Sequence, residues 1–183
     1  MNKHFLDEKT LIEDAFRLAV QVYESGFRPT FIVGLWRGGS SVGIYVQECL
    51  QVLGITTDHI SLRTSYRGQP AYEQMIAAPG EQIRVHGTQY LLENLNASDQ
   101  LLIVDDVFSS GANIQAVIDR LQQQAGRVAV LWQRKKQRRT ALKPDYCLYE
   151  TEDWLVFPYE MQGLSRAEIA KHKPYLMKIM EEE

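Results

Sequence analysis

The stretch LLIVDDVFSSGANIQAVI, residues 101–118, decides the fold class of this 183-residue chain. Its first four residues are apolar, which together with Gln100 gives the pattern of a strand buried in a parallel sheet. Apolar residues then recur at helical spacing from Ile114 to Leu121, and Gly126 ends that pattern. A buried strand, a loop and a helix in this order are typical of α/β proteins, which bind ligands at the carboxyl ends of their strands.

The loop between this strand and this helix carries two carboxylates and then small or hydroxylated residues. Unpaired backbone N–H groups at the start of the helix, with the side chains of Ser109, Ser110 and Asn113, offer donors to a phosphate. Asp105 and Asp106 would repel that phosphate, so we expect them to hold ribose hydroxyls or a divalent cation. Paired acids also occur as helix caps and in response-regulator pockets, but those pockets lack the Ser-Ser-Gly turn. The loop therefore predicts a site for phosphorylated ribose.

A second unit of the same kind lies nearer the N-terminus. Residues 6–25 show the spacing of an amphipathic helix. Thr30–Leu35 predicts a buried strand, and Arg37-Gly38-Gly39-Ser40-Ser41 predicts a glycine turn. Helical spacing resumes over Val42–Leu53 and stops at Gly54. Strand, glycine turn and helix are thus repeated.

The remaining segments complete an α/β pattern. Further short strands are predicted at Thr57–Leu62, Val128–Trp132, Pro144–Tyr149 and Trp154–Phe157. Residues 65–87 hold no sustained period, which predicts a functional loop or lid that a short hairpin could frame. We therefore expect a mostly parallel, twisted sheet with helices on both faces.

Composition excludes several classes of function. The chain is 45% hydrophobic and has a net charge of −3, so it lacks the overall charge of a nucleic-acid-binding protein. No apolar run is long enough to span a membrane, and acids stand where a signal peptide needs apolar residues. Its two cysteines, without a CxxC spacing, support neither a disulfide framework nor a zinc site. We expect a cytoplasmic protein that binds a small molecule and no membrane, and the composition disfavours a nucleic-acid partner.

Four segments of the chain resemble type I phosphoribosyltransferases. Residues 101–118 resemble the loop that binds phosphoribosyl pyrophosphate (PRPP), and FIVGLWRGG, residues 31–39, resembles the pyrophosphate-binding segment. Ser65-Tyr66 falls where hypoxanthine-type members carry Ser-Tyr on a mobile lid. KPDYCLYETEDWLVFPYE, residues 143–160, resembles the C-terminal hood of the 6-oxopurine branch.

The resemblance implies a domain organisation and a reaction. It implies one type I phosphoribosyltransferase-like domain over residues 1–183, with a core at about 26–140, a lid at about 65–87 and a small hood at about 141–183. The reaction implied is transfer of the 5-phosphoribosyl group from PRPP to hypoxanthine, guanine or xanthine, in purine salvage. A homo-oligomer, dimer or tetramer, is implied as well.

The family's phosphate-binding positions fall on residues of the two glycine-containing turns. The implied substrate-binding residues there are Trp36, Arg37, Gly38, Gly39, Ser110, Gly111, Ala112 and Asn113. The implied catalytic residues are Asp105, Asp106 and Ser109. An arginine suits pyrophosphate because it contacts phosphate oxygens in a bidentate manner. Many members have a cis peptide bond before the basic residue, which here is the bond Trp36–Arg37.

The base-binding and metal-binding positions are implied in the same way. Further substrate-binding residues would be Ser65 and Tyr66 on the lid, Arg134 or Lys135 as donor to the purine 6-oxo group, and Trp154 with Leu155 for base stacking. Asp106 and Glu160 would hold Mg²⁺. From the sequence alone, an aromatic in an apolar strand is more often a core residue, and the basic run 134–139 is more often a solvated loop.

One position departs from the branch. Members of the 6-oxopurine branch carry aspartate where this chain has Ser109, and orotate-type members carry a hydroxyl residue there. A serine without an activating partner is no general base near pH 7. Three readings stay open: a 6-oxopurine transferase, a transferase for another base, and a PRPP-sensing regulator whose basic run contacts RNA.

Overall fold

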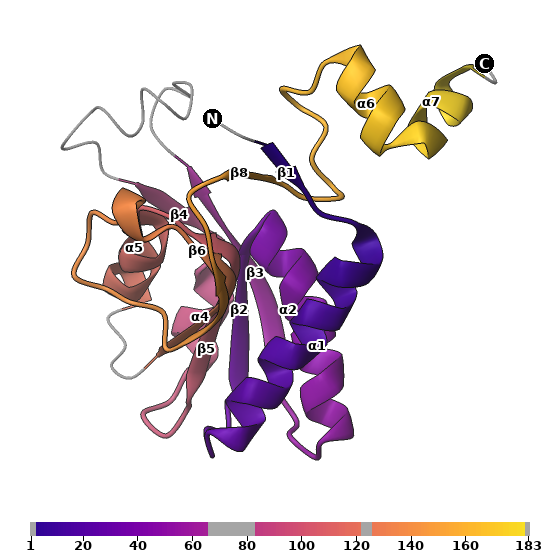
Figure 1. Ribbon diagram of the computed structural model, residues 1–183. Helices are drawn as coiled ribbons and strands as arrows, with labels where there is room; N and C mark the ends of the chain where they lie inside the picture. The colour runs from indigo at the N-terminus through magenta and orange to yellow at the C-terminus, as the bar shows by residue number, and fades with distance from the viewer. Residues whose placement is uncertain (1–2, 66–82, 122–125, 182–183) are drawn as a thin grey trace. The chain divides into compact units, whose positions relative to one another are not determined.

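The computed structural model describes residues 3–65, 83–121 and 126–181. Figure 1 shows strands alternating with helices along the chain, as the sequence predicts. The elements are β1 (Lys3–Phe5), α1 (Glu8–Glu24), β2 (Phe31–Trp36), α2 (Gly38–Val52), β3 (Asp58–Ser65), β4 (Arg84–His86), α4 (Gln89–Asn94), β5 (Leu101–Phe108), α5 (Ala112–Leu121), β6 (Arg127–Gln133), the 3₁₀ turn η1 (Lys135–Gln137), β7 (Tyr146–Glu150), β8 (Trp154–Val156), α6 (Arg166–His172) and α7 (Pro174–Glu181).

The chain divides into two compact units. The larger unit is Ile12–Glu152, and the smaller unit combines Met1–Leu11 with Asp153–Glu183. The larger unit contains a six-stranded sheet in the order β4-β3-β2-β5-β6-β7. All of its neighbouring strands run parallel except β4, which pairs antiparallel with β3. The expected α/β class with a mostly parallel sheet is confirmed.

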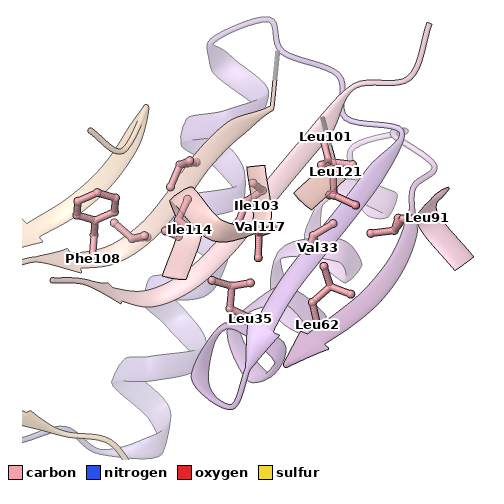
Figure 2. Packing of buried hydrophobic residues seen from close by; sticks show 12 residues of the cluster. Val33, Leu35, Leu62, Leu91, Leu101, Ile103, Phe108, Ile114, Val117 and Leu121 are labelled. Carbon is pink, nitrogen blue, oxygen red and sulfur yellow. The ribbon is translucent and has the colours of Figure 1, made fainter. Parts of the chain in front are cut away.

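Alternate residues of the central strands bury opposite faces of the sheet, as the two-residue period of a strand requires. The cluster on the face of α4 and α5 is shown in Figure 2 and comprises Val33, Leu35, Leu62, Leu91, Leu101, Ile103, Phe108, Ile114, Val117, Leu121, Val128 and Val130. Their neighbours Ile32, Leu102 and Leu131 are equally buried and point to the other face, where Figure 1 shows α1 and α2. Helices therefore cover both faces, as predicted.

Two element boundaries differ from the sequence expectation, and both shifts concern the candidate site. Helix α2 begins at Gly38 rather than at Val42, so the glycines form its first turn. Strand β5 continues to Phe108 instead of ending at Val104, because its ladder with β6 extends to the pair Phe108↔Gln133. The two acids after Val104 are consequently strand residues, held by backbone pairing.

The predicted loop at residues 65–87 is framed by a hairpin. Strands β3 and β4 form this hairpin by antiparallel pairing. Ser65 is paired with Arg84, and Arg63 is paired with His86. The lid itself was predicted for residues that mostly lie outside the described part of the chain.

The smaller unit contains elements that the sequence pattern did not predict. The three-residue strand β1 pairs parallel with β8, in a register that joins Lys3 to Trp154 and Phe5 to Val156. Helices α6 and α7 follow β8. Among the helices of the described residues, none has the length and the apolar content of a membrane span.

A first prediction concerns the contact between α2 and β5. A methyl group on Gly39 would overlap the carbonyl oxygen of Val104 and lie 2.9 Å from the Cα atom of Asp105, both of them backbone atoms that cannot turn away. We expect Gly39→Ala to lower the free energy of unfolding by about 3 kcal/mol, and hence to lower Tm by roughly 6–12 °C in a chain of this size. Thermal unfolding followed by circular dichroism measures the change.

The matched control is Gly126→Ala, directly before β6. The nearest atom to a methyl group at Gly126 lies 3.6 Å away, which is ordinary contact. Its Tm should stay within about 2 °C of the parent protein, since surface substitutions of this kind are close to neutral. A wild-type Tm for Gly39→Ala would show that α2 is not seated on β5 as described.

Candidate active site

The two predicted phosphate turns lie side by side because their strands are neighbours. β2 and β5 pair in parallel from Phe31↔Leu101 to Gly34↔Val104. The carboxyl ends of parallel neighbours meet at one edge of the sheet. That edge therefore brings the turn after β2, with Arg37, next to the acids of β5.

The turn after β2 has the backbone that the family resemblance implies. The peptide bond Trp36–Arg37 is cis, and no proline is involved. Trp36 is 58% exposed and Arg37 is exposed, whereas Gly38 and Gly39 are buried in the first turn of α2. Two residues at the turn thus face solvent, and the two glycines face the protein.

Gly39 links this turn to the acid pair. Its backbone N–H donates a hydrogen bond to the Asp105 carboxylate, and its Cα atom lies against the backbone of Val104 and Asp105. Any side chain at position 39 would overlap that backbone, so the close approach requires glycine. The pyrophosphate-type turn and the acid pair are therefore one structural unit.

The acid pair has unusual electrostatics. Burial raises the pKa of the Asp105 carboxyl well above its ordinary range, and the charge of Asp106 and the hydrogen bond between the two carboxyl groups raise it further. The backbone N–H groups of Asp106 and Gly39 act in the opposite direction. Asp106 accepts the N–H of Val107 at 2.7 Å. A hydroxyl donor or a cation bound to two such carboxyl groups lowers the electrostatic repulsion between them.

The pair fits a divalent cation only together with oxygens from a ligand or from water. Among the described residues, no group of three or more histidine, cysteine, aspartate or glutamate side chains could hold a metal ion. Mg²⁺ ordinarily keeps several waters and binds through one or two carboxylates plus substrate phosphates. The donor set at Asp105 and Asp106 is of that type.

The turn after β5 presents donors to an anion. Gly111 has a φ of 78°, which suits glycine, and Ser110 Oγ accepts the N–H of Ala112 at 3.2 Å. Asn113 Oδ1 is buried, and no described residue forms a hydrogen bond with it. The Ser-Ser-Gly turn thus leads into the first turn of α5, where helix geometry leaves backbone N–H groups without a partner inside the helix.

The structure adds Thr140 to this turn, a residue that sequence reasoning missed. A methyl group on Gly111 would overlap Thr140 Oγ1 and lie 2.7 Å from the Phe108 ring. Thr140 Oγ1 is buried and, within the described part of the chain, has no hydrogen-bond partner. A buried hydroxyl without a partner is costly unless a ligand satisfies it.

The basic segment 134–139 brings Thr140 to its place. The N–H of Arg134 donates to Phe108 O at 2.9 Å, and the N–H of Arg139 donates to Ser110 O at 2.9 Å. The segment therefore runs back along the phosphate turn. The only sequence signal for this return was that the segment follows β6, whose carboxyl end lies at the same edge of the sheet.

The two candidates for the purine 6-oxo donor differ in their surroundings. Arg134 is 6% exposed, and its Nη2 donates to Glu152 O at 3.3 Å. Lys135 is exposed and forms an ion pair with Glu150, with 2.5 Å between Nζ and Oε1. The interpretation of the whole run as a solvated loop is therefore wrong for Arg134, because its guanidinium is packed against the chain at residue 152.

The remaining site candidates lie in or near other segments. In the smaller unit, Trp154 is 38% exposed and Leu155 is 7% exposed, so these neighbours on β8 point to opposite sides. Glu160 Oε2 accepts the N–H of Phe157 at 3.1 Å. Ser65 ends β3, and Tyr66 lies outside the described residues.

Comparisons with known proteins identify the family and the fold. A family model for the phosphoribosyl transferase domain matches residues 1–164. Purine phosphoribosyltransferase from Pyrococcus horikoshii has a similar structure, with a TM-score of 0.67 at 23% identity over 91% of this chain and 99% of that chain. A hypothetical protein from Neisseria gonorrhoeae with bound ppGpp gives a TM-score of 0.73 at 15% identity over 97% of both chains.

A third similar structure is xanthine-guanine-hypoxanthine phosphoribosyltransferase from Helicobacter pylori, with a TM-score of 0.64 at 18% identity over 87% of this chain and 95% of that one. No curated protein sequence matches the chain. The match over residues 1–164 shows that the chain belongs to the phosphoribosyl transferase family. The protein is a phosphoribosyltransferase, with the fold of the type I members.

A second prediction follows from the raised pKa of Asp105. A folded-state pKa above the unfolded value means that the folded protein keeps a proton that the unfolded chain releases. Stability is therefore lost as pH rises from about 4, the ordinary pKa of aspartate, to the folded-state pKa. We expect Asp105→Asn to leave Tm unchanged near pH 4 and to raise it by a few degrees at pH 8. Scanning calorimetry across that range measures both values.

Asp119→Asn, the same change at an exposed acid of α5, is the control and should show no such pH-dependent gain. A lower Tm for Asp105→Asn than for the parent protein at pH 8 would contradict the raised pKa.

Proposed function

We propose that the protein transfers the 5-phosphoribosyl group from PRPP to a 6-oxopurine base, forming a nucleoside monophosphate and pyrophosphate. The observation that carries the proposal is the hydrogen bond from the Gly39 N–H to the Asp105 carboxylate. It places a pyrophosphate-type turn directly beside an acid pair suited to ribose hydroxyls. A ligand with ribose between two phosphate-bearing ends matches this arrangement.

Each residue of the edge has a defined part in the reaction. Arg37 and the first turn of α2 bind the leaving pyrophosphate, while Asp105 and Asp106 accept hydrogen bonds from the ribose hydroxyls. The turn at Ser110–Asn113 and Thr140 hold the 5′-phosphate. Mg²⁺ bound with PRPP would be held by Asp106 and would neutralise charge on the pyrophosphate. Catalysis is then positioning and electrostatic stabilisation of a cationic ribose at C1, without a covalent intermediate on the protein.

The base class is supported by the hood-like segment. Trp154 offers an exposed indole on which a purine would gain about 1–3 kcal/mol by stacking. Arg134, which also donates to Glu152 O, and Lys135, which is paired with Glu150, are the two candidate donors to the 6-oxo group. Purine salvage, a cytoplasmic location and a homo-oligomeric state belong to the same proposal.

The direct test is an assay of pyrophosphate release from PRPP and Mg²⁺ with hypoxanthine, guanine, xanthine, adenine and orotate. We expect release with at least one of the three 6-oxopurines and none with orotate. Release with orotate or adenine alone would move the assignment to a transferase for another base.

A second candidate function is binding of a hyperphosphorylated guanine nucleotide. The similar Neisseria gonorrhoeae structure contains ppGpp and matches 97% of this chain. The basic segment that runs along the phosphate turn, through the Arg139 contact to Ser110, would suit a ligand with additional phosphates. Tight binding of ppGpp without turnover of any base would favour this candidate, together with salt-dependent RNA binding if the protein were a regulator.

A third prediction tests Thr140 as a ligand for the 5′-phosphate. Thr140→Val keeps the shape but removes the hydroxyl, and a hydrogen bond to a charged group contributes about 1.5–3 kcal/mol. We expect PRPP binding to weaken by about tenfold or more, while the free protein keeps or gains stability because its unpaired hydroxyl is gone. Isothermal titration calorimetry and thermal unfolding measure the two effects.

The control is Thr56→Val, the same change at an exposed threonine before β3. It should leave PRPP affinity unchanged. If Thr140→Val binds PRPP as well as the parent protein does, the hydroxyl is not part of the phosphate site.

A fourth prediction concerns Ser109, which stands where the 6-oxopurine branch has aspartate. Ser109→Asp would supply a general base, and such a group contributes about 10²–10⁴-fold when it is positioned. The added charge beside Asp105 and Asp106 opposes PRPP binding, by less than the ~4 kcal/mol of unit charges 4 Å apart at moderate dielectric. We expect kcat with a 6-oxopurine to rise by at least about tenfold and KM for PRPP to increase.

Ser109→Asn, which has nearly the same shape without a charge, should give no rise in kcat. A fall in kcat for Ser109→Asp with all three 6-oxopurines at saturating PRPP would mean that Ser109 suits another base or a binding function.

A further inference from the structure

The last part of the chain lies beyond the residues that match the family and is fixed to the smaller unit by several contacts. The match ends at residue 164, and α6 begins directly afterwards with a capping box formed by Ser165 and Glu168. Lys3 Nζ donates to Glu168 Oε1 at 2.7 Å, and the Phe5 ring stacks on His172 with 3.7 Å between centroids. Helix α6 is thus held against β1 at both of its ends.

Lys173 is the residue that directly follows helix α6, and its ammonium group is buried. Lys173 is 4% exposed, and its N–H donates to Ile169 O at 2.7 Å. Its Nζ donates to Phe157 O at 3.1 Å and to Pro158 O at 2.8 Å. A buried ammonium is costly unless its three donors and its charge are satisfied. Two carbonyl oxygens satisfy two donors but do not neutralise the charge.

Glu160 belongs to the same turn. Its Oε2 accepts the N–H of Phe157 at 3.1 Å, and its N–H donates to Phe157 O at 3.0 Å. Burial lowers the pKa of the Lys173 ammonium, and the charges of Glu160 and Glu8 oppose this. Glu160 therefore belongs to the turn that binds the ammonium, and its negative charge favours the charged form of Lys173.

We propose that Lys173 is a built-in cation for Glu160 and occupies the position that the family resemblance gives to a hood-bound metal ion. Lys173 is then a positioning residue that holds the turn Phe157–Glu160 and neutralises its carboxylate. A second cation at Glu160 would be repelled by an ammonium that is already bound to the carbonyl oxygens of Phe157 and Pro158. The metal requirement of the transferase is then met at the acid pair of β5 alone.

The proposal rests on the proposed function only because that function makes Glu160 a candidate metal ligand. Its test therefore counts metal ions and needs no turnover. Bound Mn²⁺ is measured by electron paramagnetic resonance titration of the full chain with pyrophosphate present. The proteins compared are the parent, Glu160→Gln, Lys173→Ala, the double variant and Lys171→Ala, which makes the same change at an exposed lysine of α6.

We expect Glu160→Gln to bind as many Mn²⁺ ions as the parent, with dissociation constants within about twofold. Lys173→Ala should gain one ion, because no ammonium then repels a cation at this turn, and the double variant should lose that ion again. Lys171→Ala should match the parent. The loss of one ion, or a tenfold weaker constant, in Glu160→Gln alone would overturn the proposal.

A folded Lys173→Ala that gains no Glu160-dependent ion would also overturn it. If Lys173→Ala does not fold, the Glu160→Gln titration in the parent background decides by itself. Failure of the proposed transfer reaction would instead appear as no pyrophosphate release with any base, whatever the number of bound ions. The two failures are therefore separate.

Discussion

The close contact between the first turn of α2 and the end of β5 is the constraint on which the site depends. Gly39 has no side chain, so its backbone N–H reaches the Asp105 carboxylate and its Cα atom rests on the backbone of Val104. The parallel register of β2 and β5 makes the two turns neighbours, and the glycine reduces their separation to a hydrogen bond. A ligand that spans both turns meets a single rigid edge. Substrate orientation can then be fixed by the sheet and not by a flexible loop.

The buried acid pair beside this contact makes the free protein less stable at neutral pH. Burial and the charge of Asp106 raise the pKa of Asp105, so ionisation of the pair opposes folding. A hydroxyl donor or a cation removes this cost when it binds, and the unpaired polar atoms of Asn113 and Thr140 act in the same direction. Functional sites commonly hold such unsatisfied groups, and the binding of ligand then restores the lost stability.

The parts of the site that sequence could predict are those set by local order. The acid pair, the Ser-Ser-Gly turn and the glycines after β2 each follow directly from a strand that has a clear apolar pattern. The start of α2 could not be placed from sequence, because consecutive glycines predict a loop. Only the structure shows that Gly39 packs against the backbone of β5 in the first turn of a helix. Strand β1 has only three residues and pairs with a strand about 150 positions away, so no local period marks it.

Thr140 and Lys173 were missed for the same physical reason. Each reaches its place through a return of the chain: Thr140 through the contact of Arg139 with Ser110, and Lys173 through the helix that Lys3 holds at Glu168. They differ in what they add. Among the described residues, the Thr140 hydroxyl at the turn after β5 has no partner, whereas the Lys173 ammonium donates to the carbonyl oxygens of Phe157 and Pro158. Under the proposal that Lys173 neutralises Glu160, the transferase depends on metal only at the acid pair of β5.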